Sequence, residues 1–174
     1  KTAFQEPPYT TAREFVAEIR AATPDTLQYL VTDMFERITL YENKTSEASF
    51  RKLPNGKYLV TMTVESKKLY ADSLGNETPQ ALGDWIDIGV FGKKGAPNAD
   101  GKTGADNNGA ASGSASGSSN AFALGKPLYF QKHKITQAKT RFEFTVDEEP
   151  QKAGIDPYNK LIDRTPSDNA RELR

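Results

Sequence analysis

The chain has 174 residues, with 23 basic and 23 acidic side chains, one histidine and no cysteine. This length suffices for one ordinary domain, or for one compact domain with a helical piece attached. The balanced charge argues against a nucleic-acid partner, and the lack of cysteine excludes thiolate metal sites, thiol nucleophiles and disulfide bonds. No apolar run approaches the ~18 residues that cross a bilayer, so we expect no direct membrane insertion by this chain.

The first part of the chain predicts a helical hairpin at residues 1–37. Thr11 and Glu14 have the spacing of a capping box, and apolar residues follow at helical intervals. Thr23-Pro24 then ends the first helix and begins a second, since proline loses no needed donor at the first helical position. The second helix carries the longer apolar stripe, so we expect it to be the more buried of the two. That stripe consists of Leu27, Leu30, Val31, Met34, Phe35 and Ile38.

Beyond the hairpin the sequence changes to the alternation of apolar and polar residues that is typical of strands. Pro54-Asn55-Gly56 predicts a tight turn between two of them, because Asn-Gly tolerates the positive φ angles of such turns. The strand-like runs are residues 37–43, 48–53, 57–71, 85–91, 127–135 and 141–147. Five or six strands with short connections predict an antiparallel arrangement.

One connection is long. Residues 93–121 contain no apolar side chain larger than alanine or proline, so they cannot offset an ordering entropy of roughly 1–2 kcal/mol per residue. We predict a flexible Gly/Ser-rich insertion there. The whole pattern predicts an α+β, mainly β fold, in which an antiparallel β-sandwich-like domain at residues 38–169 follows the helical hairpin.

The C-terminal stretch combines apolar residues with turn signals at Asp156-Pro157 and Thr165-Pro166. We therefore expect it to dock on the folded body rather than to be a mobile tail. Its expected apolar anchors are Ile155, Tyr158, Leu161 and Ile162. The last residues, from Ala170 onward, are expected to fray.

Candidate chemical groups are few. His133 is the single histidine, so a His-Glu-x-x-His zinc site cannot form within this chain, and its lysine neighbours predict a solvated position. Asp84 and Asp87 flank Trp85, but a regular strand places the two carboxylates on opposite faces. A tryptophan at the start of a sandwich strand is more typical of core than of a sugar-binding platform.

The tail holds a second group of oxygen ligands. Asp156, Asn159 and Asp163 are suited to a hard cation, although Asp-Pro more often builds a turn in which the aspartate accepts backbone hydrogen bonds. We therefore predict no catalytic, metal or cofactor-binding residue in this chain.

Several blocks of the sequence resemble a known family. "AGIDPYNKLIDRTPSDN" at residues 153–169, preceded by "TRFEFTVDEEP", is similar to the C-terminal end of large bacterial membrane proteins. Those proteins join an ABC-transporter-type permease to a zinc aminopeptidase module of the aminopeptidase N family. Residues 23–77, 82–92 and 125–135 resemble the same proteins.

The resemblance implies a parent protein that removes N-terminal residues from peptides. The zinc ligands of that parent would lie upstream of Lys1. No position here matches the family's catalytic motifs. The chain would then be a non-catalytic C-terminal accessory domain that covers or shapes the peptidase module or docks a protein or peptide partner, and its nearest partners would be the upstream peptidase and helical region of the same polypeptide. We expect the parent in the bacterial inner membrane and this domain in a soluble compartment such as the periplasm. The start at Lys1, without an initiator methionine, agrees with a fragment of a longer protein.

A different class of protein also fits the pattern. A free-standing β-sandwich module that binds carbohydrate or peptide would use aromatic contacts, and the candidates for that surface are Trp85, Tyr129 and Tyr158.

The composition makes a first prediction. The purified chain should hold no stoichiometric zinc and should not hydrolyse aminoacyl reporter substrates, because one histidine and no cysteine cannot supply the usual ligand set. Metal analysis after washing with a chelator checks this, and one tightly held zinc per chain would contradict it.

Overall fold

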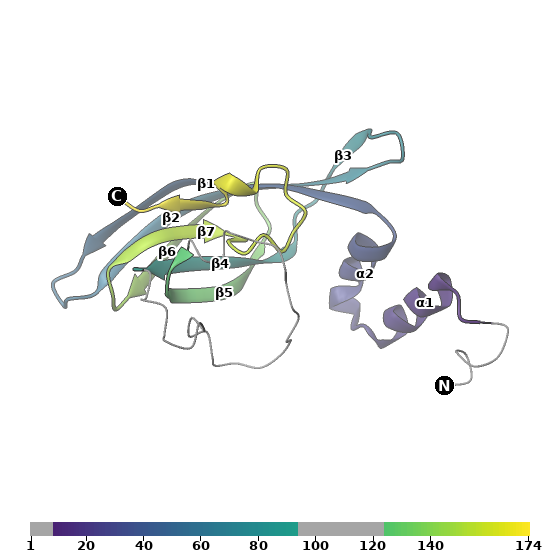
Figure 1. Cartoon of the computed structure of the whole chain (residues 1–174), viewed down its shortest axis with the longest axis horizontal. Helices are drawn as coiled ribbons and strands as arrows, with labels where there is room; N and C mark the ends of the chain where they lie inside the picture. The colour runs from purple at the N-terminus through teal and green to yellow at the C-terminus, as the bar shows by residue number, and fades with distance from the viewer. Residues whose placement is uncertain (1–8, 94–123) are drawn as a thin grey trace, which may run out of the picture. The chain divides into compact units, whose positions relative to one another are not determined.

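The computed structural model describes residues 9–93 and 124–174, so the predicted insertion lies, apart from Lys93, outside the described residues. The elements in chain order are α1 (Ala12–Ala22), a 3₁₀ turn (Asp25–Leu27), α2 (Gln28–Phe35), β1 (Ile38–Lys52), β2 (Tyr58–Ala71), β3 (Glu77–Gln80), β4 (Asp84–Gly92), β5 (Pro127–Ile135), β6 (Lys139–Val146), β7 (Pro150–Ile155), a second 3₁₀ turn (Pro166–Asp168) and β8 (Ala170–Glu172) (Figure 1). No helix among these is long and apolar enough to cross a bilayer.

The chain forms two compact units. One contains the residues up to Leu40 together with 69–80, and the other contains 41–68 together with 81–174. The strands β1 and β2 contribute residues to both units.

The helical hairpin of the first unit forms as its caps predict. Glu14 N donates to Thr11 Oγ1 (3.3 Å) and Thr11 N donates to Glu14 Oε2 (2.7 Å), which completes the capping box. Arg20 then joins the two helices by donating to Gln28 Oε1 (3.1 Å) and to Glu36 Oε1 (2.7 Å). The hairpin is therefore held mainly by polar contacts.

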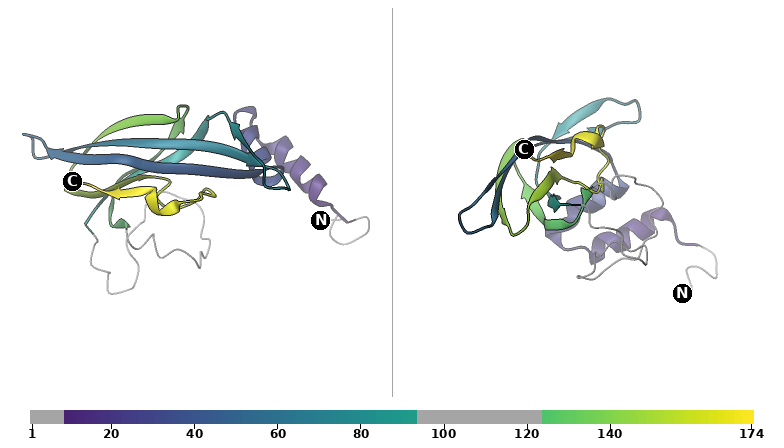
Figure 2. Two further views of the ribbon diagram at one scale, coloured as in Figure 1. Left: turned by 90° about the horizontal axis from the view of Figure 1, so that it is seen from above. Right: turned by 60° about the vertical axis from the view of Figure 1, so that its left-hand side comes forward.

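The strands form two four-stranded sheets, which confirms the predicted α+β, mainly β fold with antiparallel sheets and two short N-terminal helices (Figure 2). In one sheet β2 lies between β1 and β6, and β3 joins β2 as well. The other has the order β5-β4-β7-β8. Gly56 has φ of 81° in the predicted turn between β1 and β2.

The strand β1 is a single long strand and not the two that the sequence predicts. Asn43 and Thr45, in its middle, are polar but buried, so the apolar alternation stops there although the strand continues. The strands β3, β7 and β8 are also absent from the prediction, because they are short and lack an apolar alternation.

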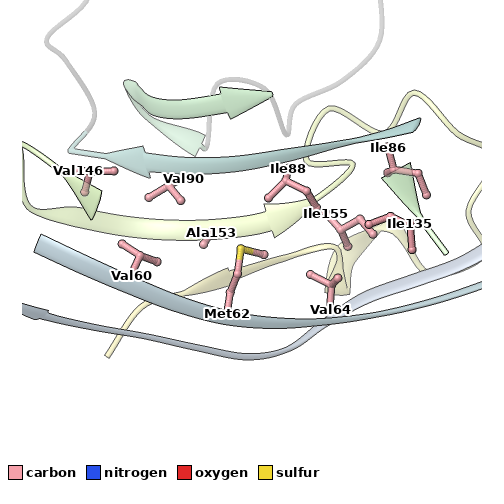
Figure 3. Close-up of a cluster of buried hydrophobic side chains, with 10 residues drawn as sticks. All are labelled: Val60, Met62, Val64, Ile86, Ile88, Val90, Ile135, Val146, Ala153 and Ile155. Carbon is pink, nitrogen blue, oxygen red and sulfur yellow. The ribbon is translucent and has the colours of Figure 1, made fainter. Parts of the chain in front are cut away.

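The core of the second unit lies between the two sheets (Figure 3). Alternate residues of β2 and β4 point into it, and both strands carry a branched or long apolar side chain at every second position. Burial of each such side chain contributes about 1.5–3 kcal/mol. The buried cluster consists of Val60, Met62, Val64, Ile86, Ile88, Val90, Ile135, Val146, Ala153 and Ile155.

The C-terminal stretch docks on this core, but only some of its expected anchors are buried. Ile155 is fully buried within β7, and Leu161 packs against the core. Ile162 is 68% exposed, so its expected role as an anchor was wrong. Its backbone carbonyl instead accepts from Tyr41 N (2.9 Å).

Polar contacts hold the same stretch against β1. Asn43 N donates to Asp163 Oδ2 (2.9 Å), and Thr45 Oγ1 donates to the carbonyl oxygen of Asn169 (2.7 Å). With its amide nitrogen as donor, Asn169 also reaches the carbonyl oxygen of Asn43 at 2.7 Å. Asn43 and Asn169 are both buried, so these hydrogen bonds are shielded from competing water.

The last residues do not fray as predicted. Ala170–Glu172 form β8, which pairs with β7, and Leu173 N donates to the carbonyl oxygen of Gln151 (2.8 Å). Leu173 also packs against the core. Backbone pairing, which the side chains of "ARELR" do not reveal, orders this end.

The docked stretch gives the second prediction. Truncation after Pro150 removes most of β7 and all of β8 and should abolish cooperative unfolding, because Ala153 and Ile155 leave the core. Truncation after Asn169 should cost about 1–3 kcal/mol through lost pairing and the lost burial of Leu173. Denaturant unfolding of both proteins checks this. Equal stability of the Asn169 truncation and the full chain would show that β8 contributes nothing.

Candidate functional site

The sheet β5-β4-β7-β8 has one side in the core and one side facing away from it. On β4 the residues Ile86, Ile88 and Val90 point inward, so the intervening residues point outward. The antiparallel register places Lys134 beside Trp85, Lys132 beside Asp87, and Phe130 beside Gly89. We call this surface the outer face. It consists of Trp85, Asp87, Gly89, Phe91, Phe130, Lys132, Lys134, Lys152, Tyr158 and Lys160, of which Asp87, Gly89 and Phe91 are buried beneath the others.

Trp85 is 49% exposed on the outer face, so the expectation that it belongs to the core was wrong. The three inward residues of β4 fix the phase of the strand, and this phase turns Asp84 inward instead. Asp84 is buried and forms an ion pair with the buried Lys68 at 2.9 Å. The alternation of Ile86, Ile88 and Val90 in the sequence already indicated which side of the strand faces the core.

Asp87 lies at the centre of the outer face and is only 4% exposed. Its carboxylate binds two lysines, with Lys160 Nζ at 2.9 Å and Lys132 Nζ at 3.2 Å. Both lysine side chains are more than half exposed. The carboxylate is therefore covered, and the two ammonium groups are exposed to solvent.

Aromatic rings surround this ionic group. Tyr158 packs edge-to-face against Phe91, with ring centroids 6.0 Å apart, and against Phe130, at 5.1 Å. Lys160 Nζ lies 5.4 Å from the centroid of the Phe130 ring, within reach of a cation–π interaction. A Cβ atom at Gly89 would lie 2.6 Å from the ring of Phe91, so glycine is required for this packing.

The turn after β7 positions Tyr158 and Lys160. Asp156 has φ of 40°, donates its N–H to the carbonyl oxygen of Asp87 (2.7 Å) and is buried. Its two carboxylate oxygens accept from Lys160 N (3.0 Å) and Leu161 N (2.9 Å). Burial raises the pKa of Asp156 despite these donors.

These contacts favour a structural role for the tail carboxylates. Both oxygens of Asp163 accept hydrogen bonds as well, from Asn43 N and Thr165 N. No group of three or more histidine, aspartate or glutamate side chains suited to a metal ion occurs in the part of the chain that the structure describes.

Tyr129 does not share the outer face with Trp85 and Tyr158. It pairs in register with Val90 and stacks on Phe144, with ring centroids 4.1 Å apart. Its hydroxyl lies 2.7 Å from His133 Nε2. The structure therefore places two of the three candidate aromatic residues, Trp85 and Tyr158, on the same face of the sheet.

His133 is half-buried and packs edge-to-face on Phe142 at 5.0 Å, so the expectation of a solvated position was wrong. The register with Ile86 places it on the inward side of β5, where its lysine neighbours point the other way. Burial lowers the pKa of His133, which favours the neutral imidazole.

A polar cavity of about 400 Å³ lies beside β1 and β2, lined among others by Glu42, Lys44, Glu65 and Asp168. Its lining holds two ion pairs, Lys44 with Glu65 at 2.9 Å and Lys67 with Glu42 at 3.2 Å, and two further carboxylates, Asp163 and Asp168. Burial and the nearby Asp163 raise the pKa of Asp168.

The helical hairpin of the first unit exposes most of its apolar stripe. Val31 is the one buried residue of α2, and α1 buries none. A groove of about 470 Å³ runs between the helices, lined by Val16, Ala17 and Phe35 among others. The exposed apolar side chains of the hairpin and its flanks are Tyr9 (62%), Phe15 (55%), Leu30 (39%), Met34 (71%), Phe35 (45%) and Ile38 (53%).

Comparison of the chain with protein-family models, curated proteins and solved structures finds no match.

The shared carboxylate generates the third prediction. Lys132→Met and Lys160→Met should each change stability by no more than about 1 kcal/mol, because the remaining lysine still pairs with Asp87. The double variant leaves a buried carboxylate without a counter-charge and should lose about 3–5 kcal/mol. Urea unfolding of the four proteins measures this coupling. Simple additivity of the two single effects would show that the two lysines do not substitute for each other at Asp87.

Proposed function

We propose that the chain is a non-catalytic accessory domain of a larger, membrane-associated zinc aminopeptidase with an ABC-transporter-type permease part. In this proposal the helical hairpin packs against the helical region that precedes it in the parent. The observation that carries the proposal is the exposed apolar stripe of α1 and α2.

The hairpin leaves most of its apolar surface exposed. Arg20 and Gln28 join the helices through hydrogen bonds, whereas Phe15 and Phe35 meet edge-to-face at 6.4 Å and both remain about half exposed. Single exposed apolar residues are ordinary on protein surfaces, but neighbouring large ones mark a contact surface. Further helices would complete such a surface, and the resemblance of residues 23–77 to the family supplies the candidate.

Several contacts support a role without catalysis. Asp87 and Asp156 are engaged by lysines and backbone N–H groups, and His133 lies among aromatic rings. The zinc ligands and catalytic glutamate of the proposed parent lie upstream, so this domain would cover the peptidase module or shape access to it.

A free-standing binding module is the second candidate function. Exposed Trp85 and half-buried Tyr158, which share the outer face, favour it, whereas Tyr129 does not contribute to that surface. This candidate needs no partner for the helical hairpin.

The fourth prediction separates the two candidates. The upstream helical region of the parent, expressed separately, should co-purify with the chain. The double variant Phe15→Glu, Met34→Glu should weaken this binding at least about tenfold, since it places two charges in an apolar contact.

Leu74→Glu is the matched control, because Leu74 is 86% exposed in the same unit but lies outside the helices. It should leave binding unchanged. Failure of the unmodified chain to bind, or equal binding by the double variant, would refute the docking proposal and leave the free-standing module.

A further inference from the structure

We propose that the outer face binds an acidic protein segment that carries apolar side chains on either side of its acidic residue. This inference goes beyond the docking of the helical hairpin and does not depend on it, because every residue of the outer face belongs to the second unit.

The charge of the outer face indicates an anionic partner. Four lysines lie on it, and Lys132 and Lys160 share the single carboxylate of Asp87. Asp87 is covered, whereas both lysine side chains are more than half exposed, so the group presents net positive charge. No ion pair engages Lys134 in the described part of the chain, and the acidic residue across from Lys152 is Glu172, on the short edge strand β8.

Apolar groups lie on both sides of this charge. Trp85 and Lys134 form one cross-strand row, Asp87 and Lys132 form the next, and Gly89 and Phe130 form the third, beside Tyr158. Along an extended strand four residues span about 13 Å, so Trp85 and Phe130 flank the lysines within the reach of a short segment. Such a segment would place an acidic residue between two apolar ones.

The backbone beneath the outer face is ordered before any ligand arrives. Pairing of β4 with β5 and β7 sets the rows, and the turn held by Asp156 sets Tyr158 and Lys160. A surface that is already ordered loses little entropy on binding.

The same contacts argue against a neutral sugar as the ligand. Sugar hydroxyls are usually bound by exposed carboxylates and amides beside an aromatic ring. Here both carboxylates next to Trp85 are buried in ion pairs, Asp84 with Lys68 and Asp87 with two lysines.

The experiment uses the full chain. A random-peptide library displayed on phage is selected against it, and synthetic copies of the enriched peptides are titrated while the fluorescence of Trp85, the single tryptophan, is followed. We expect enriched peptides that are acidic with flanking apolar residues, a fluorescence change on binding, and a marked loss of affinity when salt is raised. Poly-L-glutamate and cellohexaose serve as a purely anionic and a neutral sugar probe.

Two variants locate the site. Lys134→Glu should weaken peptide binding about tenfold, and Trp85→Ala, followed with a labelled peptide, should weaken it by a similar factor. Lys52→Glu is the matched control, since it makes the same charge change in β1 of the other sheet and should leave binding unchanged. The salt dependence of the unmodified chain supplies a test that needs no variant.

Several results would overturn the inference. These are a selection that enriches no peptides or only neutral or basic ones, an equal loss of binding in Lys52→Glu, or a response to cellohexaose without a response to the acidic peptides. None of these outcomes bears on the hairpin, because the proposed docking on the upstream helical region is measured with variants of the first unit.

Discussion

The phase of β4 governs both the interior and the surface of the second unit. Ile86, Ile88 and Val90 are almost completely buried against β2. Their burial places the side chains of the residues between them on the opposite side of the sheet. A shift by one residue would bury the side chain of Trp85 and expose three core side chains, at a cost of several kcal/mol. The outer face is therefore specified by the core and not by interactions of its own.

Polar contacts fix the position of the C-terminal stretch against β1. The inward side of β1 carries Asn43 and Thr45, which are buried, and the C-terminal stretch binds the backbone N–H of Asn43 and the hydroxyl of Thr45. Such contacts are directional, so they fix one position of the tail where apolar packing alone would allow several. In the described chain two buried side-chain atoms have no hydrogen-bond partner, Asn43 Nδ2 on β1 and Asp84 Oδ2 on β4.

The sequence predicted the elements whose side chains alternate strongly. The turn at Asn55-Gly56 and the strands β2 and β6 follow from local pattern alone, whereas on β4 the expected place of Trp85 in the core was wrong. The local pattern did not predict the strands β7 and β8. Backbone pairing across the sheet makes them strands, although their sequences contain glycine, lysine and arginine. For the candidate site, the pattern found Trp85 and Tyr158 but not the lysines that join them, since cross-strand neighbours depend on register that no single strand encodes.

The position of β7 in its sheet also bears on how the protein forms during synthesis. It lies between β4 and β8, yet it is the last long strand of the chain. Until it leaves the ribosome, one edge of β4 has no partner, and the inward side chains of β2 and β4 lack part of their cover. Contacts between residues so distant in sequence form slowly, and unpaired edges promote aggregation. The nascent chain should therefore be the form of this protein that most needs protection by chaperones.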